Sequence, residues 1–124
     1  MNTTEPKQIY FSLRRLPPSL NELLSSHWRK RYDLKKIYDE IIGVEWLRLN
    51  KLVFTKPVKL IYVLSFSGQR RQRDLDNYIG GTKLMTDALK RTFLFRDDSE
   101  WITSIEVKFT RGNEGTVIFI KEDV

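Results

Sequence analysis

Two aspartates, Asp74 and Asp76, directly follow the cationic run Gln69-Arg70-Arg71-Gln72-Arg73. We predict an extended backbone here, in which these two side chains point to the same face and Leu75 turns toward the core. Carboxylates this close resist joint ionisation unless a cation compensates them. A hard divalent ion with oxygen ligands, Mg²⁺ in particular, is the natural compensator, so the pair is a candidate metal site.

The spacing of the pair carries little weight by itself. Sixteen acidic residues in 124 give roughly two such pairs by chance, and Asp98 with Glu100 is another. The context strengthens the prediction: a basic run stands before the pair, Lys83 follows it, and Asp97-Asp98 comes farther along the chain. Together these residues suit a site that acts on phosphates.

Composition excludes several other chemistries. The chain has no cysteine and one histidine, His27, which excludes disulfides, thiolate sites and a His-rich zinc cage. Gly80-Gly81 stands without a Walker or dinucleotide-binding signature. A formal net charge of +6 and a pI near 9.7 favour polyanionic partners such as nucleic acid or acidic lipid. With no secretory signal or membrane-length apolar run, we expect a soluble cytoplasmic protein that does not bind membranes.

The elements that must position these residues follow from hydrophobic periodicity. Alternation at Ile9, Phe11 and Leu13 predicts a first strand, which ends before Pro17-Pro18. We predict a loop over 17–26, an amphipathic helix over 30–50, a central strand over 58–66 and a shorter helix over 83–92. Alternation at Ile105, Val107 and Phe109 predicts a further strand, and the turn 112–115 would join it to 116–120 as a β-hairpin.

The predicted order is therefore strand, helix, strand, helix, strand, strand in one small domain over 1–124. This order is typical of the α+β class, with a mixed or largely antiparallel sheet packed by helices.

The ordered series of motifs resembles a known family. Asp74-Leu75-Asp76-Asn77, then Lys83, Asp87-Ala88-Leu89 and Asp97-Asp98, is similar to the pattern of the RusA family of Holliday junction resolvases (crossover junction endodeoxyribonucleases). Pro17-Pro18-Ser19-Leu20-Asn21 resembles the opening motif of that family. The resemblance spans most of the chain, with one local departure, because Gly80-Gly81-Thr82 looks like a three-residue insertion before the lysine.

The resemblance implies a RusA-like fold and a Mg²⁺-dependent endonuclease, with Mn²⁺ as a substitute ion. It makes Asp74, Asp76 and Asp98 the metal-binding, catalytic carboxylates, Lys83 the essential lysine and Arg73 the basic residue beside the first carboxylate. It further implies a homodimer that resolves branched DNA by paired symmetric cuts in recombination and repair. Such a protein would be bacterial or phage-encoded and associated with the nucleoid.

Several other residues have both a functional and a structural interpretation. Arg70 and Arg71, with Lys30 and Arg31 among the cations at 29–36, either grip DNA or form a solvated surface. We favour DNA contact, and expect Asn21 near the DNA. Asp87, Asp97 and Asn77 are candidates to support the metal ligands. Asp87 could instead join Lys83 and Arg91 in a surface ladder of ion pairs, and Asp97 could be a turn residue. His27 and Trp28 are expected to anchor the loop before the helix.

Two rival functions stay open. One is a general metal-dependent nuclease acting on flaps, forks or RNA. The other is a non-catalytic nucleic-acid-binding module with a structural acidic cluster. A glycosyltransferase reading of Asp74-Leu75-Asp76 is disfavoured, because the chain is small and lacks a nucleotide fold.

Overall fold

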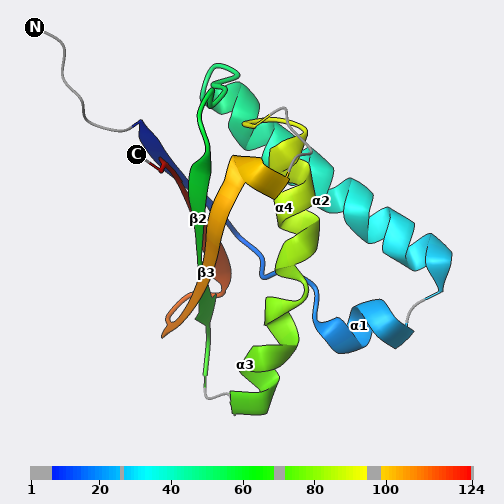
Figure 1. Ribbon diagram of the computed structural model, residues 1–124. Helices are drawn as coiled ribbons and strands as arrows, with labels where there is room; N and C mark the ends of the chain where they lie inside the picture. The colour runs from blue at the N-terminus through cyan, green and yellow to red at the C-terminus, as the bar shows by residue number, and fades with distance from the viewer. Residues whose placement is uncertain (1–6, 26, 69–71, 95–98, 124) are drawn as a thin grey trace, which may run out of the picture.

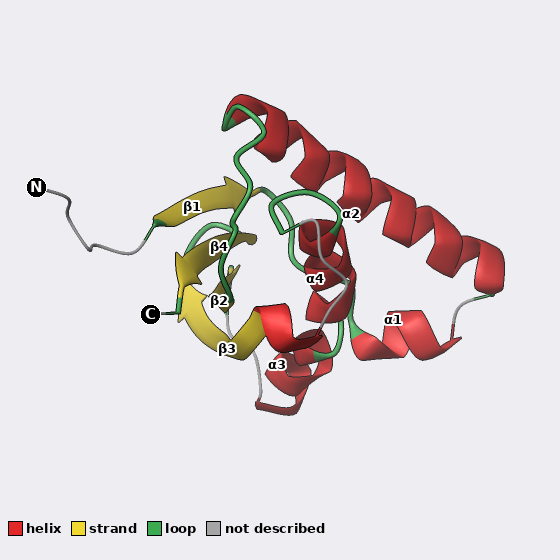
Figure 2. Cartoon of the chain, turned by 45° about the horizontal axis from the view of Figure 1, so that its top comes forward, coloured by secondary structure: helices red, strands yellow, loops and turns green. Residues whose placement is uncertain are grey.

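One sheet and a layer of helices make up the fold in the computed structural model (Figures 1 and 2). The structure describes residues 7–25, 27–68, 72–94 and 99–123, without the side chains of residues 25, 72–74 and 99. The helices lie on one face of the sheet and leave the other face uncovered in both views. The predicted α+β class and mixed sheet are confirmed.

The sheet has four strands in the order β1-β4-β2-β3. β4 pairs antiparallel with both β1 and β2, whereas β2 and β3 are parallel. As predicted, β2 is a central strand, and its residues from Val58 to Phe66 alternate between buried and less buried positions. The strand bounds are Gln8–Leu13 for β1, Val58–Phe66 for β2, Ile102–Arg111 for β3 and Gly115–Glu122 for β4.

The predicted hairpin between the last two strands is wrong. β3 and β4 are joined by a short connection, but β2 lies between them and pairs with both. The connection crosses the end of β2, where the Gly112 amide donates to the Phe66 carbonyl at 3.1 Å. Gly112 has φ +156°, a conformation that favours glycine. The turn sequence 112–115 is compatible with a hairpin and also with a connection that passes over a third strand. The pairing of β2 with both β3 and β4 produces the second arrangement.

The two predicted helices are present. α2 spans Trp28–Arg48 and buries Leu34, Tyr38 and Ile42, which belong to the predicted apolar stripe. His27, which was expected to anchor the preceding loop with Trp28, caps the start of α2 by accepting from the Arg29 amide, and the side chain of Trp28 is exposed. α4 spans Thr82–Lys90 and packs against α2. No helix in the described ranges combines the length and apolarity needed to cross a bilayer.

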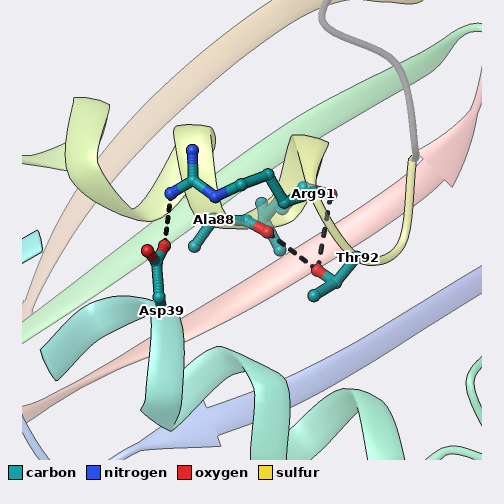
Figure 3. A network of polar contacts seen from close by, with 5 residues as sticks. Asp39, Ala88, Arg91 and Thr92 are labelled. Atoms are coloured by element: carbon teal, nitrogen blue, oxygen red, sulfur yellow. Dashed lines mark hydrogen bonds and ion pairs between the residues drawn. The ribbon is translucent and has the colours of Figure 1, made fainter. Parts of the chain in front are cut away.

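An ion pair ties the far end of α4 to α2. Figure 3 shows Arg91, the residue after α4, reaching Asp39 on α2. Thr92 turns back to donate to the Ala88 carbonyl at 2.9 Å. The contact of Arg91 is therefore with another helix and not with Asp87 in a ladder along α4.

Two helices were not predicted. α1, Leu20–Ser25, occupies part of the expected loop, and the hydroxyl of Ser19 accepts from the Glu22 amide at 3.1 Å. Ser19 and Glu22 have the spacing of a capping box, so the sequence did carry a local signal for this helix. α3, Gln72–Ile79, occupies the segment predicted to be extended. A 3-10 turn, η1 (Ser99–Trp101), precedes β3.

Candidate nucleic-acid and metal site

The acidic segment of the candidate site is helical. The prediction of an extended backbone at Asp74 and Asp76 is therefore wrong. The reason is tertiary packing: Leu75 and Tyr78, three residues apart, are both half-buried, and the Tyr78 ring meets Phe66 edge-on at 5.1 Å between centroids. Leu75 does turn toward the core as predicted, and Asp76 is exposed.

Lys83 is held in solvent by the packing of its neighbours. Thr82 and Thr86 are buried, and the Thr86 hydroxyl donates to the Thr82 carbonyl at 3.0 Å. Because the hydroxyl hydrogen of Thr86 is engaged in this bond, the Tyr62 hydroxyl is the donor in its contact with the Thr86 oxygen at 2.5 Å. Burial raises the pKa of Tyr62 above its ordinary value. This contact joins α4 to the central strand and leaves Lys83, in the first turn of α4, exposed.

The opening motif packs against the junction between α3 and α4. A β-carbon added to Gly81 would lie 1.8 Å from the Pro18 carbonyl oxygen, and one added to Gly80 would lie 3.2 Å from a Leu20 methyl carbon. α1 and α3 are also in contact. The segment that looks like an insertion in the sequence is thus the place where two distant motifs touch, with Asn21 exposed on α1 and Asn77 half-buried on α3.

A cavity of about 360 Å³ opens beside this junction. Tyr38 forms part of its wall and donates to the Leu16 carbonyl at 2.6 Å, while the Arg15 guanidinium lies 5.3 Å from the Tyr38 ring. Burial raises the pKa of Tyr38. Arg15, Glu22 and Tyr78 also belong to this region, although no sequence motif pointed to them. The cavity is lined by Arg15, Leu16, Pro17, Pro18, Ser19, Glu22, Tyr38, Tyr78 and Glu114.

Several residues predicted to bind the metal or the DNA fall outside the part of the chain that the structure describes. Arg70, Arg71, Asp97 and Asp98 lie outside the described residues, as do the side chains of Arg73 and Asp74. Among the side chains that the structure does describe, no three acidic, histidine or cysteine residues gather as a metal site. α3 follows the end of β2, whereas η1 precedes the start of β3, its parallel neighbour (Figure 1). Because β2 and β3 are parallel, these two elements lie at opposite ends of the strand pair. Asp98 itself lies outside the described residues, so its convergence with Asp76 stays a prediction.

No protein-family model matches the chain, and no curated protein matches it in sequence. The functional assignment therefore rests on the residues themselves and their placement.

The remaining predicted residues fall in two places. Asp87 is half-buried one turn after Lys83 on α4, and no ion pair joins these two described residues. Lys30 and Arg31 are exposed in the first turn of α2. The Lys30 ammonium lies 3.7 Å from the Glu22 carboxylate of α1, so the basic start of α2 is linked to the helix that contacts α3.

Proposed function

We propose that this protein is a Mg²⁺-dependent DNA endonuclease that resolves four-way junctions by paired symmetric cuts. The observation that carries the proposal is the contact of Pro18 with Gly81. It joins the opening motif to the segment with Asp76, Asn77 and Lys83, so both parts of the resemblance belong to one region of the fold.

Two of the described side chains have the chemistry needed to cleave a phosphodiester with a bound metal ion. Asp76 is an exposed carboxylate, and Lys83 is an exposed cation on the next helix. Bound Mg²⁺ would activate water and stabilise charge on the leaving oxygen. Lys83, a compact point charge, would stabilise negative charge that develops on the phosphate. Asp74 and Asp98 would complete the ligands, with Asn77, Asp87 and Asp97 supporting them.

A net charge of +6 supports DNA as the substrate, since phosphate contacts dominate affinity for nucleic acid. Lys30 and Arg31 on α2 would contact the backbone of the DNA arms, beside Asn21 on α1. Arg70, Arg71 and Arg73 would do so near the acidic cluster. Lys30 pairs with Glu22 on α1, and α1 contacts α3, the helix that carries Asp76.

A homodimer belongs to the proposal, because two cuts related by two-fold symmetry need two sites. The uncovered face of the sheet is the surface that we assign to the second copy. Tyr10 is 68% and Phe119 is 37% exposed there, with their rings 5.5 Å apart, and Ile61, Val63 and Val117 continue the apolar surface. Strand spacing gives this face roughly 500 Å² per copy, or about 1,000 Å² for a pair, near the lower limit for a specific interface.

Cleavage of a synthetic four-way junction tests the function. We expect Mg²⁺-dependent nicks at symmetric positions, which Asp76→Asn abolishes while junction binding persists. Glu40→Gln, which alters an exposed carboxylate on α2 beyond the basic stretch 28–36, is the matched control and should cleave normally. Mg²⁺-dependent cleavage by Asp76→Asn at the wild-type rate would overturn the assignment.

Parallel substrates separate the rivals. Equal cleavage of junction, linear duplex and RNA would indicate a general nuclease. Binding that is indifferent to Mg²⁺ and produces no nicks would indicate a non-catalytic binding module.

A further inference from the structure

Two aromatic side chains stand in solvent at the start of α2. Trp28 is 59% and Tyr32 is 62% exposed. They lie one turn apart, so they share one face of the helix. That face differs from the one through which α2 reaches the core, which holds Leu34, Tyr38 and Ile42. Neither ring is needed to fill the core, and large exposed aromatic rings commonly mark binding surfaces.

Cations surround the two rings. The Arg29 guanidinium carbon lies 5.5 Å from the Trp28 ring centroid, and Lys35 and Lys36 are exposed in the turn after Tyr32. The stretch 28–36 holds five basic residues and one acidic residue, Asp33, for a local charge of +4. Rings and charges together fit a ligand with both flat apolar faces and negative groups.

We propose that Trp28 and Tyr32 form a stacking platform for unpaired bases of DNA, while the neighbouring cations hold the phosphates. Every base has a π face, so stacking on aromatic side chains requires no particular sequence. Blunt duplex hides these faces inside its own stack, whereas single strands and opened branch points present them. The inference rests on the proposed function only in taking DNA as the ligand, and it adds a base-binding site distant in sequence from Asp76.

Trp28 also provides an optical signal. Of the three tryptophans, Trp46 and Trp101 are half-buried, and the Trp46 indole donates to the Leu52 carbonyl at 2.9 Å. Quenching of exposed tryptophan emission by a short oligothymidylate should therefore report Trp28. Trp28→Phe should remove most of that quenching and keep most of the affinity, because phenylalanine still stacks.

Affinity measurements on the full chain test the platform. We expect Trp28→Ala and Tyr32→Ala each to weaken oligothymidylate binding about 10-fold, and blunt duplex binding less than about 2-fold. Leu47→Ala removes another exposed apolar side chain of α2 and should change neither. Circular dichroism should show wild-type folding for all three variants, since these side chains lie outside the core.

Three outcomes would overturn the inference. The first is single-strand affinity within 2-fold of wild type in both aromatic variants. The second is a purely electrostatic effect, seen as an equal loss for single strand and duplex or as equal quenching by heparin, which carries charge without bases. The third is quenching by vesicles of phosphatidylcholine and phosphatidylserine in place of DNA, which would indicate a membrane surface.

The two proposals fail in different ways. If Asp76→Asn still cleaves junctions while Trp28→Ala loses single-strand affinity, the nuclease site is wrong and the platform stands. If Trp28→Ala binds single strands normally while Asp76→Asn abolishes cleavage, only the platform fails.

Discussion

Gly81 lies so close to Pro18 that a β-carbon on it would approach the Pro18 carbonyl oxygen to 1.8 Å. Only glycine permits this approach, because the atom it meets belongs to the backbone and cannot rotate away. The contact explains why glycine stands between α3 and α4. It also fixes the opening motif beside the segment that carries Asp76 and Lys83.

Gly81→Ala should therefore lower the free energy of unfolding by about 1–3 kcal/mol, as overpacking does elsewhere. Gly43→Ala is the matched control: it lies within α2 with nothing within 4 Å of an added β-carbon. It should raise the free energy of unfolding by up to about 1 kcal/mol through helix propensity. Urea unfolding measures both, and equal effects of the two substitutions would contradict the tight contact.

Lys83→Ala should lower the rate of junction cleavage by about 10²-fold or more, because a cation aimed at developing charge is lost. Its exposure predicts a change in unfolding free energy within about 0.5 kcal/mol. Lys56→Ala, at another exposed lysine before β2, should cleave normally. Single-turnover cleavage with excess protein makes the comparison, and normal cleavage by Lys83→Ala would remove this residue from the mechanism.

Phe119→Lys should convert the dimer to a monomer, because it buries an unpaired charge in the uncovered sheet face. Val44→Lys introduces the same charge at an exposed apolar position on α2 and should leave the dimer intact. Sedimentation velocity over a range of concentrations distinguishes the two species. A wild-type monomer, or a Phe119→Lys dimer, would exclude the sheet face as the interface.

Tyr62→Phe should cost about 1 kcal/mol at neutral pH, the value of one buried hydrogen bond. Burial raises the pKa of folded Tyr62 above the unfolded value of about 10. The stabilising contribution is therefore complete below that pH, and it declines above it, where the unfolded tyrosine ionises and the folded one stays protonated. The wild type should lose stability above pH about 10 more steeply than Tyr62→Phe. Urea midpoints across this range measure the difference, and identical slopes would contradict the assignment.

The elements that could be predicted are those whose burial pattern is local. β2 alternates from Val58 to Phe66, and α2 repeats Leu34, Tyr38 and Ile42 at four-residue steps. Each pattern fits only one backbone period. α3 escaped prediction because its two inward residues, Leu75 and Tyr78, give too short a pattern, and their partners, Phe66 among them, come from elsewhere.

In the candidate site too, some features could be predicted from the sequence and others could not. Residue types and their order singled out Asp76 and Lys83, and the structure shows both exposed on consecutive helices. The nearness of the opening motif could not be read from the chain, since Pro18 and Gly81 meet only after the sheet and helices have packed. Trp28 was expected to anchor a loop, and its exposure depends on which face of α2 the core covers.

The sequence by itself determined the basic charge, the aspartates and lysine that form the candidate site, and the strands and helices with strong periodicity. These properties depend on residue identity and on contacts within a few positions. Tertiary structure alone decided that β2 separates β3 from β4, that the acidic segment is helical and that Gly81 touches Pro18. Each of these depends on atoms brought together from distant parts of the chain, where burial of apolar surface outweighs local preference.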